Sequence, residues 1–214
     1  MTHILHLDSS PRGDRSVSRT LTKQFVHLWK QFHPNVTITY RDLGHHPVSP
    51  IDEAWIAAAF SSPHERTPPL ETALMVSDEL IDELLAADLL VFGIPMYNYS
   101  VPANFKAYID QIVRVQRTFT IGSDGYEGLV HGKKALVITT RGGSYAGGPL
   151  DFQEPYLRAV FEFIGIVDIT FIHAENLSMG AEERQFSIAG AHQAIQHTIG
   201  AWQSSYSLSN SSYW

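Results

Sequence analysis

The chain has 214 residues, a formal net charge of −7 and no cysteine. Its length, with 44% hydrophobic and 17% charged residues, is typical of one compact domain. Without cysteine the chain has no disulfide, no thiolate metal ligand and no cysteine nucleophile, so any redox chemistry requires a bound cofactor. The negative charge and the absence of a lysine and arginine cluster argue against nucleic-acid binding, and we expect small-molecule partners.

Membrane and secretion signals are not found in the sequence. No stretch approaches the roughly 20 apolar residues of a membrane helix. The first residues, Met1 to Ile4, do not form a basic region followed by an apolar secretion segment. We therefore expect a cytoplasmic protein with no membrane partner.

Strand and helix patterns alternate along the chain. Apolar runs predict strands over 3–7, 36–40, 89–94, 135–139 and 169–173. Helical spacing predicts helices from Val17 or Ser18 to His33, over 70–85, over 101–116, after Pro149, and over 182–202. This alternation predicts an α/β fold: a flavodoxin-like, three-layer, doubly wound five-stranded parallel sheet in the order 2-1-3-4-5.

Two segments interrupt the alternation. Residues 41–69 contain five prolines and are predicted to be a long loop that covers a site or contacts a partner. Residues 119–130 contain Gly122-Ser123-Asp124-Gly125, which suits a hairpin turn. We assign residues 1–203 to one domain and 204–214 to a polar C-terminal tail, held loosely unless Tyr213 and Trp214 find a surface pocket.

The loop after the first predicted strand has the composition of a phosphate site. It leads into the first helix, where free N–H groups and the helix dipole favour an anion. Hydroxyl donors are available at Ser10, Ser16 and Ser18, and Arg12, Arg15 or Arg19 could add charge. The alternative is that Ser16 or Ser18 only caps the helix. Neither Gly-x-x-x-x-Gly-Lys-Ser/Thr nor Gly-x-Gly-x-x-Gly occurs, which favours a monophosphate over a larger nucleotide.

Two further loops follow the third and fourth predicted strands. Pro95-Met96-Tyr97-Asn98-Tyr99 could support a flat aromatic cofactor, or be a turn whose rings pack inward. Thr140-Arg141-Gly142-Gly143 could offer amides to the polar edge of a flavin, or be a simple glycine turn. In the predicted order, strands one, three and four are neighbours, so the three loops converge. This arrangement suits flavin mononucleotide (FMN).

Other kinds of site have weaker support. Only His45 and His46 are adjacent among the histidines, and no His-x-x-x-His pair lies near a carboxylate on a predicted helix, so we predict no metal site. The Gly-x-Ser-x-Gly elbow of serine hydrolases is missing. Pro95 and Met96 stand where a phosphate-accepting receiver domain would need a carboxylate.

Several motifs together resemble one family over nearly the whole chain. They are Ser9-Ser10 with Ser16-Val17-Ser18, Pro95 to Tyr99 with Phe105 to Asp110, Gly128 to Ala135, and Thr140 to Gly143. With these motifs the chain resembles the bacterial FMN-dependent NADH:quinone oxidoreductases, also called azoreductases. The resemblance implies tightly bound, non-covalent FMN in a homodimer, with each flavin near the subunit interface.

The resemblance also implies roles for individual residues. The FMN phosphate is assigned to Ser10, Ser16, Val17 and Ser18. The isoalloxazine ring is assigned to Pro95, Met96, Tyr97, Asn98, Tyr99, Thr140, Arg141, Gly142 and Gly143. Asn98, Tyr99 and Tyr145 are expected to position the substrate. Thr140 replaces a frequent serine and Tyr99 a frequent phenylalanine of the family, while Tyr145 is expected to narrow the substrate entrance.

The resulting hypothesis is a ping-pong, two-electron oxidoreductase. NADH or NADPH gives hydride to the flavin, leaves, and is replaced by a quinone or azo compound that receives it. No side chain is assigned as a general acid, because solvent can supply the protons. The alternative from another class is a flavodoxin-type single-electron carrier, whose usual acidic docking face is not evident here; a structural or sensory flavoprotein is a third possibility.

Overall fold

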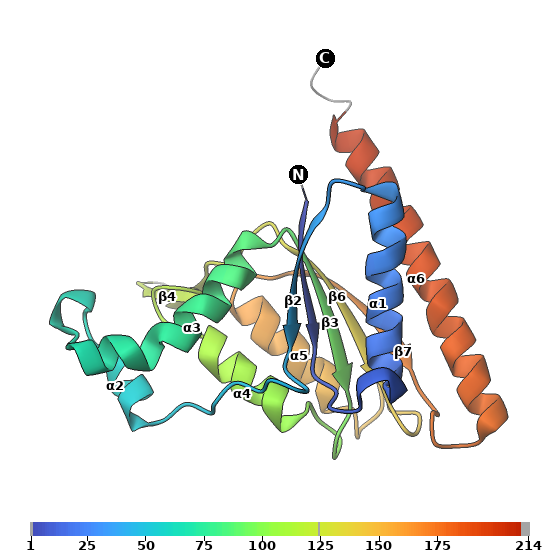
Figure 1. The fold of residues 1–214 in the computed structure, drawn as a ribbon, viewed down its shortest axis with the longest axis horizontal. Helices are drawn as coiled ribbons and strands as arrows, with labels where there is room; N and C mark the ends of the chain where they lie inside the picture. The colour runs from blue at the N-terminus through green and yellow to red at the C-terminus, as the bar shows by residue number, and fades with distance from the viewer. Residues whose placement is uncertain (1, 124, 211–214) are drawn as a thin grey trace.

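The computed structural model describes residues 2–123 and 125–210, with side chains described up to residue 203. Its centre is a five-stranded sheet with helices on both faces (Figure 1). The strands are β1 (His3–Asp8), β2 (Thr37–Asp42), β3 (Leu89–Pro95), β6 (Lys134–Thr140) and β7 (Asp168–Ala174). All neighbouring pairs are parallel and the order is β2-β1-β3-β6-β7, which confirms the predicted order 2-1-3-4-5.

Two groups of helices form the outer layers. Helices α1 (Val17–Phe32) and α6 (Ala181–Asn210) cover one face of the sheet, and α3 (Pro68–Ala86), α4 (Ala103–Ile112) and α5 (Gln153–Phe163) cover the other (Figure 1). None of the helices in the described part of the chain combines the length and apolarity needed to cross a bilayer.

Helix α1 illustrates how the sequence pattern becomes a packed layer. Ser16 caps its first turn, and the buried side chains Leu21, Phe25 and Trp29 recur on one face at helical spacing. Trp29 stacks on Phe25 at 5.8 Å between ring centroids and meets Trp202 of α6 edge-on at 6.1 Å. This aromatic cluster holds α6 beside α1.

The predicted long loop over residues 41–69 is wrong in part. It contains helix α2 (Glu53–Phe60) and a short 3-10 turn (Pro63–Glu65). Asp52 caps α2 by accepting a hydrogen bond from the Trp55 amide at 2.8 Å, and Trp55 packs with Leu74 of α3. The pattern missed this helix because its eight residues are too few and too uniformly apolar to show helical periodicity.

The predicted hairpin is confirmed as the antiparallel pair β4 (Phe119–Gly122) and β5 (Gly125–Gly128), although Asp124 lies outside the described residues. Phe119 and Tyr126 pack on Phe163 of α5, with centroids 4.8 and 5.5 Å away. At the other end of the chain, α6 continues to Asn210, past the predicted end at 202. Tyr213 and Trp214 lie outside the described part, and the domain boundary at 203 stays a prediction.

Candidate functional site

The carboxyl ends of β1, β3 and β6 meet at one edge of the sheet. Strand register places Asp8 beside Gly93 and Pro95 beside Thr140. A cavity of about 250 Å³ opens there, lined by Ser10, Arg12, Ser16, Val17, Pro95, Met96, Tyr97, Thr140, Arg141, Gly142, Leu177, Ser178 and Arg184. The three loops singled out in the sequence therefore converge. The predicted residues Ser18, Asn98, Tyr99, Gly143 and Tyr145 are not among those that line this cavity.

The loop between β1 and α1 carries buried hydroxyl groups. Ser16 caps α1 by accepting a hydrogen bond from the Arg19 amide at 3.4 Å, so the capping role is confirmed, and its Oγ lies 3.1 Å from that of Ser18. Ser10 is 1% exposed and accepts a hydrogen bond from the Arg12 amide at 3.4 Å. Among the described residues we find no acceptor for the Ser10 hydroxyl hydrogen, so this group can donate to a ligand.

Arg19 holds this loop in place. Its Nε donates to the Ser10 carbonyl oxygen at 2.7 Å, and its guanidinium forms an ion pair with Asp42. Burial raises the pKa of Asp42, but hydrogen bonds from Arg19 and His45 outweigh burial and leave that pKa well below its ordinary value. The charge of Arg19 is thus already matched within the protein.

Two glycines allow the loop to approach its neighbours. A Cβ atom at Gly44 would lie 2.1 Å from the Ser10 carbonyl oxygen, and one at Gly93 would lie 2.4 Å from an Asp8 carboxylate oxygen. Asp8 is 2% exposed and accepts hydrogen bonds from Thr22 at 2.9 Å and from Tyr40 at 3.1 Å. The loop is therefore held by the close approach of Gly44 to Ser10 and of Gly93 to Asp8, which a residue with a Cβ atom would prevent.

The loop after β3 is a strained turn. Tyr97 and Ser100 exchange two backbone hydrogen bonds of 2.9 and 3.1 Å, and the two residues between them have positive φ, 49° at Asn98 and 69° at Tyr99. This is the type I′ arrangement, which is unfavourable for tyrosine. The alternative of rings packed inward is wrong, because Tyr97 is 38% and Tyr99 46% exposed. Strained residues of this kind cluster at functional sites.

Arg141 after β6 is part of a buried network. Its side chain is fully buried and donates to Asp151 at 2.9 Å, Gln153 at 3.2 Å and Glu175 at 3.4 Å. Its Nη2 has no hydrogen-bond partner among the described residues. Arg141 lines the cavity, its other side-chain nitrogens hold the loop, and its backbone amide is bonded to the Ala174 carbonyl oxygen at 2.9 Å, so Nη2 is the donor of this residue that is left for a ligand.

Glu175 organises the chain beyond Gly143. It accepts hydrogen bonds from the amides of Tyr145 at 2.7 Å and Ala146 at 2.8 Å. Burial raises the pKa of Glu175, but these bonds and Arg141 outweigh burial, so the pKa lies below its ordinary value. Tyr145 is thereby placed with its ring edge-on to that of Tyr99, at 5.8 Å, so two predicted substrate residues are in contact.

Three lining residues were missed by sequence reasoning. Leu177 and Ser178 follow β7, and their amides bond to the carbonyl oxygens of Arg141 and Gly142 at 3.1 and 3.0 Å. Arg184 reaches the cavity from α6. Neither residues 177–178 nor the start of α6 carries a recognisable motif. The sequence indicated their place only through the fifth predicted strand, which also ends at this edge of the sheet.

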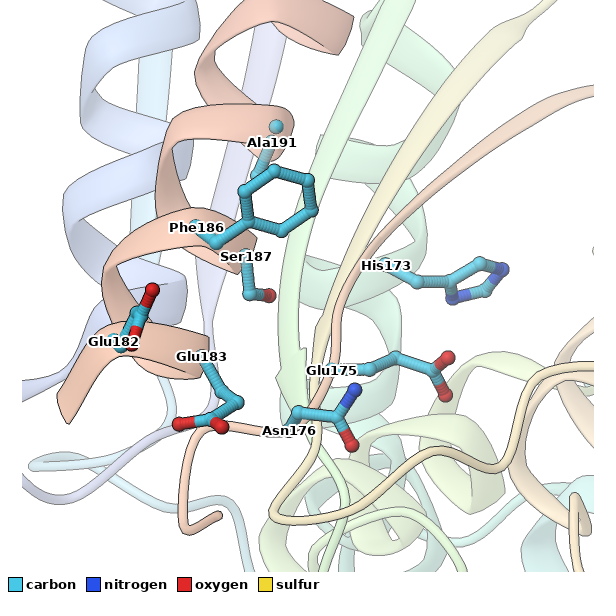
Figure 2. A pocket seen from close by; sticks show the side chains of 9 residues that line it. His173, Glu175, Asn176, Glu182, Glu183, Phe186, Ser187 and Ala191 are labelled. Carbon is cyan, nitrogen blue, oxygen red and sulfur yellow. The ribbon is translucent and has the colours of Figure 1, made fainter. Parts of the chain in front are cut away.

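A larger cavity of about 480 Å³ lies between β7 and α6 (Figure 2). It is lined by His173, Glu175, Asn176, Glu182, Glu183, Phe186, Ser187, Gly190 and Ala191. Figure 2 shows Phe186 and Ser187 on α6 and the His173 ring on the far side of β7. This lining has carboxylates and no arginine or lysine, so it does not suit a phosphate. The smaller cavity, with buried hydroxyls at one end and aromatic and glycine loops at the other, fits a flavin mononucleotide.

Comparison with known proteins agrees with this site. A family model described as a flavodoxin-like fold matches residues 2–199. FMN-dependent NADH:quinone oxidoreductase 1 of Trichormus variabilis is 73% identical over 94% of this chain and 98% of its own. FMN-dependent NADH:quinone oxidoreductase of a Nostoc species is 59% identical over 94% of this chain and 100% of its own.

Solved structures show the same fold. An azoreductase from Bacillus anthracis superposes with a TM-score of 0.85 at 27% identity, covering 94% of this chain and 100% of its own. An FMN-dependent NADH-azoreductase of that species in complex with FMN has a TM-score of 0.81 at 26% identity, covering 93% and 100%. The chain belongs to the flavodoxin-like fold family and, within it, to the FMN-dependent NADH:quinone oxidoreductases. The predicted fold and family are confirmed.

Proposed function

We propose that this chain is an FMN-dependent oxidoreductase that takes hydride from NADH or NADPH and reduces quinones and azo compounds. The observation that carries the proposal is the convergence of three chemically different loops on one cavity. The relatives whose names state this activity cover nearly the whole chain at up to 73% identity. Neither a hydrolase nor a metal enzyme requires a serine loop, an aromatic loop and a glycine loop around one cavity.

The phosphate side of the cavity, defined as residues 8–19, would hold the FMN phosphate. Ser10, Ser16 and Ser18 offer hydroxyl groups, and Val17 opens the first turn of α1, where unpaired amides and the helix dipole favour an anion. The serines are 4% exposed or less, so an anion bound there would be shielded from competing water.

The ring side of the cavity, defined as residues 95–99 and 140–145, would hold the flavin ring. When bound, FMN supplies acceptance and donation of hydride. Pro95, Met96 and Tyr97 provide a wall beside the sheet edge. The amides of Gly142 and Gly143 would donate to the polar edge of a ring placed there, whereas the Arg141 amide is already bonded to the Ala174 carbonyl oxygen. Asn98, Tyr99 and Tyr145 would align a flat donor or acceptor, and no side chain is required to act as a general acid.

A homodimer is part of the proposal. The hairpin and the segment before α5 expose large apolar side chains: Ile121 is 60%, Tyr126 69%, Leu150 47% and Phe152 56% exposed. Such exposure supports burial against a second copy of the chain. Light scattering of the purified protein should give twice the chain mass of 23.9 kDa. We also propose a cytoplasmic location, consistent with the family.

Two half-reactions test the function. Anaerobic NADH should bleach the flavin absorbance of the purified protein, and a quinone should then restore it. Steady-state rates at varied NADH and quinone should give parallel double-reciprocal lines. A single-electron carrier would instead accumulate a one-electron-reduced flavin during titration and turn over quinones slowly, and that outcome would replace the proposal.

A further inference from the structure

Four arginines differ from the others in having no carboxylate partner within the part of the chain that the structure describes. Among the residues that the structure describes, the arginines in ion pairs with Asp or Glu are Arg19, Arg41, Arg114, Arg117, Arg141 and Arg158. The remaining arginines of the chain are Arg12, Arg15, Arg66 and Arg184. Arg66 donates to the carbonyl oxygens of Ala58 and Ser61, near α2. The other three lie together.

Arg12, Arg15 and Arg184 surround the first turn of α1. Arg12 and Arg184 line the cavity described above, and all three line a second cavity of about 420 Å³. The two cavities share Arg12, Ser16, Val17 and Arg184, so they adjoin at the helix N-terminus. Helices α1 and α6 begin near the same end of the sheet (Figure 1), which is why a residue of α6 can reach this point.

The side chain of Arg184 is held near the cavity by one weak contact. Its Nη1 donates to the Leu177 carbonyl oxygen at 3.4 Å. Ser178, the residue after Leu177, donates its amide hydrogen to the carbonyl oxygen of Gly142 on the ring side. Among the described residues this is the only hydrogen bond that the guanidinium makes, so most of its five donors are available. Arg184 is half-buried, which places its charge partly out of water.

Arg12, which is exposed, and Arg184, which is half-buried, line one small cavity, and neither has a carboxylate partner among the described residues. A phosphate dianion bound there would balance their positive charges and accept charge-assisted hydrogen bonds from both. The Ser10 hydroxyl, 1% exposed and without an acceptor among the described residues, lines the same cavity. Three donors from two segments, the loop before α1 and the start of α6, thus line one cavity whose described lining residues include no carboxylate.

We infer that Arg184, together with Arg12, binds the phosphate of FMN, so that α6 as well as α1 completes the phosphate side. The inference rests on the proposed function, and it assigns a cofactor-binding role to a helix that the three-loop description leaves out. The inference requires that the contribution of Arg184 to FMN affinity depends on the phosphate and not on the isoalloxazine ring.

The experiment compares FMN with riboflavin, which has the same ring and no phosphate. Dissociation constants for both are measured by quenching of flavin fluorescence on titration with the flavin-free full chain. R184Q keeps an amide donor for the Leu177 carbonyl oxygen but loses the positive charge. R184K keeps the positive charge but loses the planar guanidinium, which can donate two parallel hydrogen bonds to a phosphate. For R184Q we expect FMN affinity to fall about 10-fold with riboflavin affinity unchanged, and for R184K a smaller loss.

Lys30→Gln is the matched control. Lys30 lies in the last turn of α1, roughly 20 Å from the phosphate side, so its charge is screened there. This variant should bind FMN like the wild-type chain. An equal loss in K30Q and R184Q would show a general charge effect and overturn the inference.

Other outcomes separate the inference from the proposed function. If wild-type protein binds FMN but R184Q binds it equally well, the inference is wrong and the proposed function stands. If R184Q weakens FMN and riboflavin to the same extent, Arg184 only supports the loop at Leu177, and the inference is again wrong. If the wild-type chain binds neither flavin, the proposed function fails first. Should R184Q not fold, the same comparison in R184K decides.

Discussion

The phosphate side and the ring side of the cavity are built differently. On the phosphate side the serines are 4% exposed or less and the loop backbone is held by Arg19, Gly44 and buried Asp8. On the ring side Tyr97 and Tyr99 are 38% and 46% exposed, and the turn from Tyr97 to Ser100 is strained at Asn98 and Tyr99. A buried polar site selects a ligand group that pairs with its donors, since leaving buried polar atoms without hydrogen bonds costs free energy. An exposed aromatic surface accepts many flat molecules.

The largest expected effect comes from the buried ion pairs beneath the ring side. Arg141→Met leaves Asp151 and Glu175 without their cation, and we expect the free energy of unfolding to fall by about 3–5 kcal/mol. Denaturant unfolding measures this loss. The control is Arg158→Met, because Arg158 is 43% exposed and pairs with Glu154 on the same helix. Its loss should be about 1 kcal/mol or less. Equal losses would contradict the importance of burial.

The next effect concerns the backbone of the phosphate side. In Gly44→Ala the new Cβ would lie 2.1 Å from the Ser10 carbonyl oxygen, so the loop must shift. We expect the free energy of unfolding to fall by about 1–3 kcal/mol and FMN affinity to fall about 10–100-fold. Thermal melting and fluorescence titration measure the two.

A helical glycine supplies the control for that change. Gly190→Ala in α6 adds a Cβ that meets no atom within 4 Å. It should leave FMN affinity unchanged and raise the stability of the protein by up to about 1 kcal/mol, through helix propensity. A Gly44→Ala protein that binds and melts like wild type would show that the phosphate side is more adaptable than its close contacts indicate.

A smaller effect is expected on the ring side. Tyr145→Ala removes the ring that meets Tyr99 edge-on, and aromatic pairs of this kind are worth about 0.5–1.5 kcal/mol. We expect the KM for a quinone to change about 3–10-fold while FMN affinity changes less than about twofold. Tyr145→Phe keeps the ring and should behave like wild type. If FMN affinity falls as much as quinone affinity, the two sides do not divide their roles as proposed.

The smallest effect is a pH dependence of stability. Burial lowers the pKa of His173 below its ordinary 6.5, and the Arg141 charge lowers it further, despite nearby Glu154. Between the folded pKa and 6.5 the unfolded chain binds the proton more readily. This contribution to stability is therefore complete above pH 6.5 and is lost as the pH falls through the folded pKa. Denaturant midpoints from pH 7.5 to 5 should decline less in His173→Gln than in wild type.

Several features of the site follow from local sequence. The polar loop before Val17, the aromatic pentapeptide after Ile94 and the glycines after Thr140 were each placed at a strand end by apolar runs next to polar residues. The strand order then required these ends to meet. Ser16 as the helix cap was likewise predictable, because serine at that position bonds to the amide of Arg19, within the same turn.

Other features depend on contacts between distant segments. Nothing next to Arg141 in sequence shows that its guanidinium would be buried against Asp151 and Glu175, 10 and 34 residues away. Helix α2 was missed because its packing on α3 stabilises it more than its own short pattern.

The order of strands and helices, the parallel sheet, the position of the three loops and the family follow from the amino-acid sequence, because these depend on short-range periodicity and on motifs. Which polar groups are already paired follows from the folded arrangement alone. Arg19 is matched by Asp42, whereas Arg184 arrives from α6 with no carboxylate among the described residues. Pairing is a property of distances between chain segments, and a side chain's chemistry at a site depends on what remains unpaired after the chain has folded.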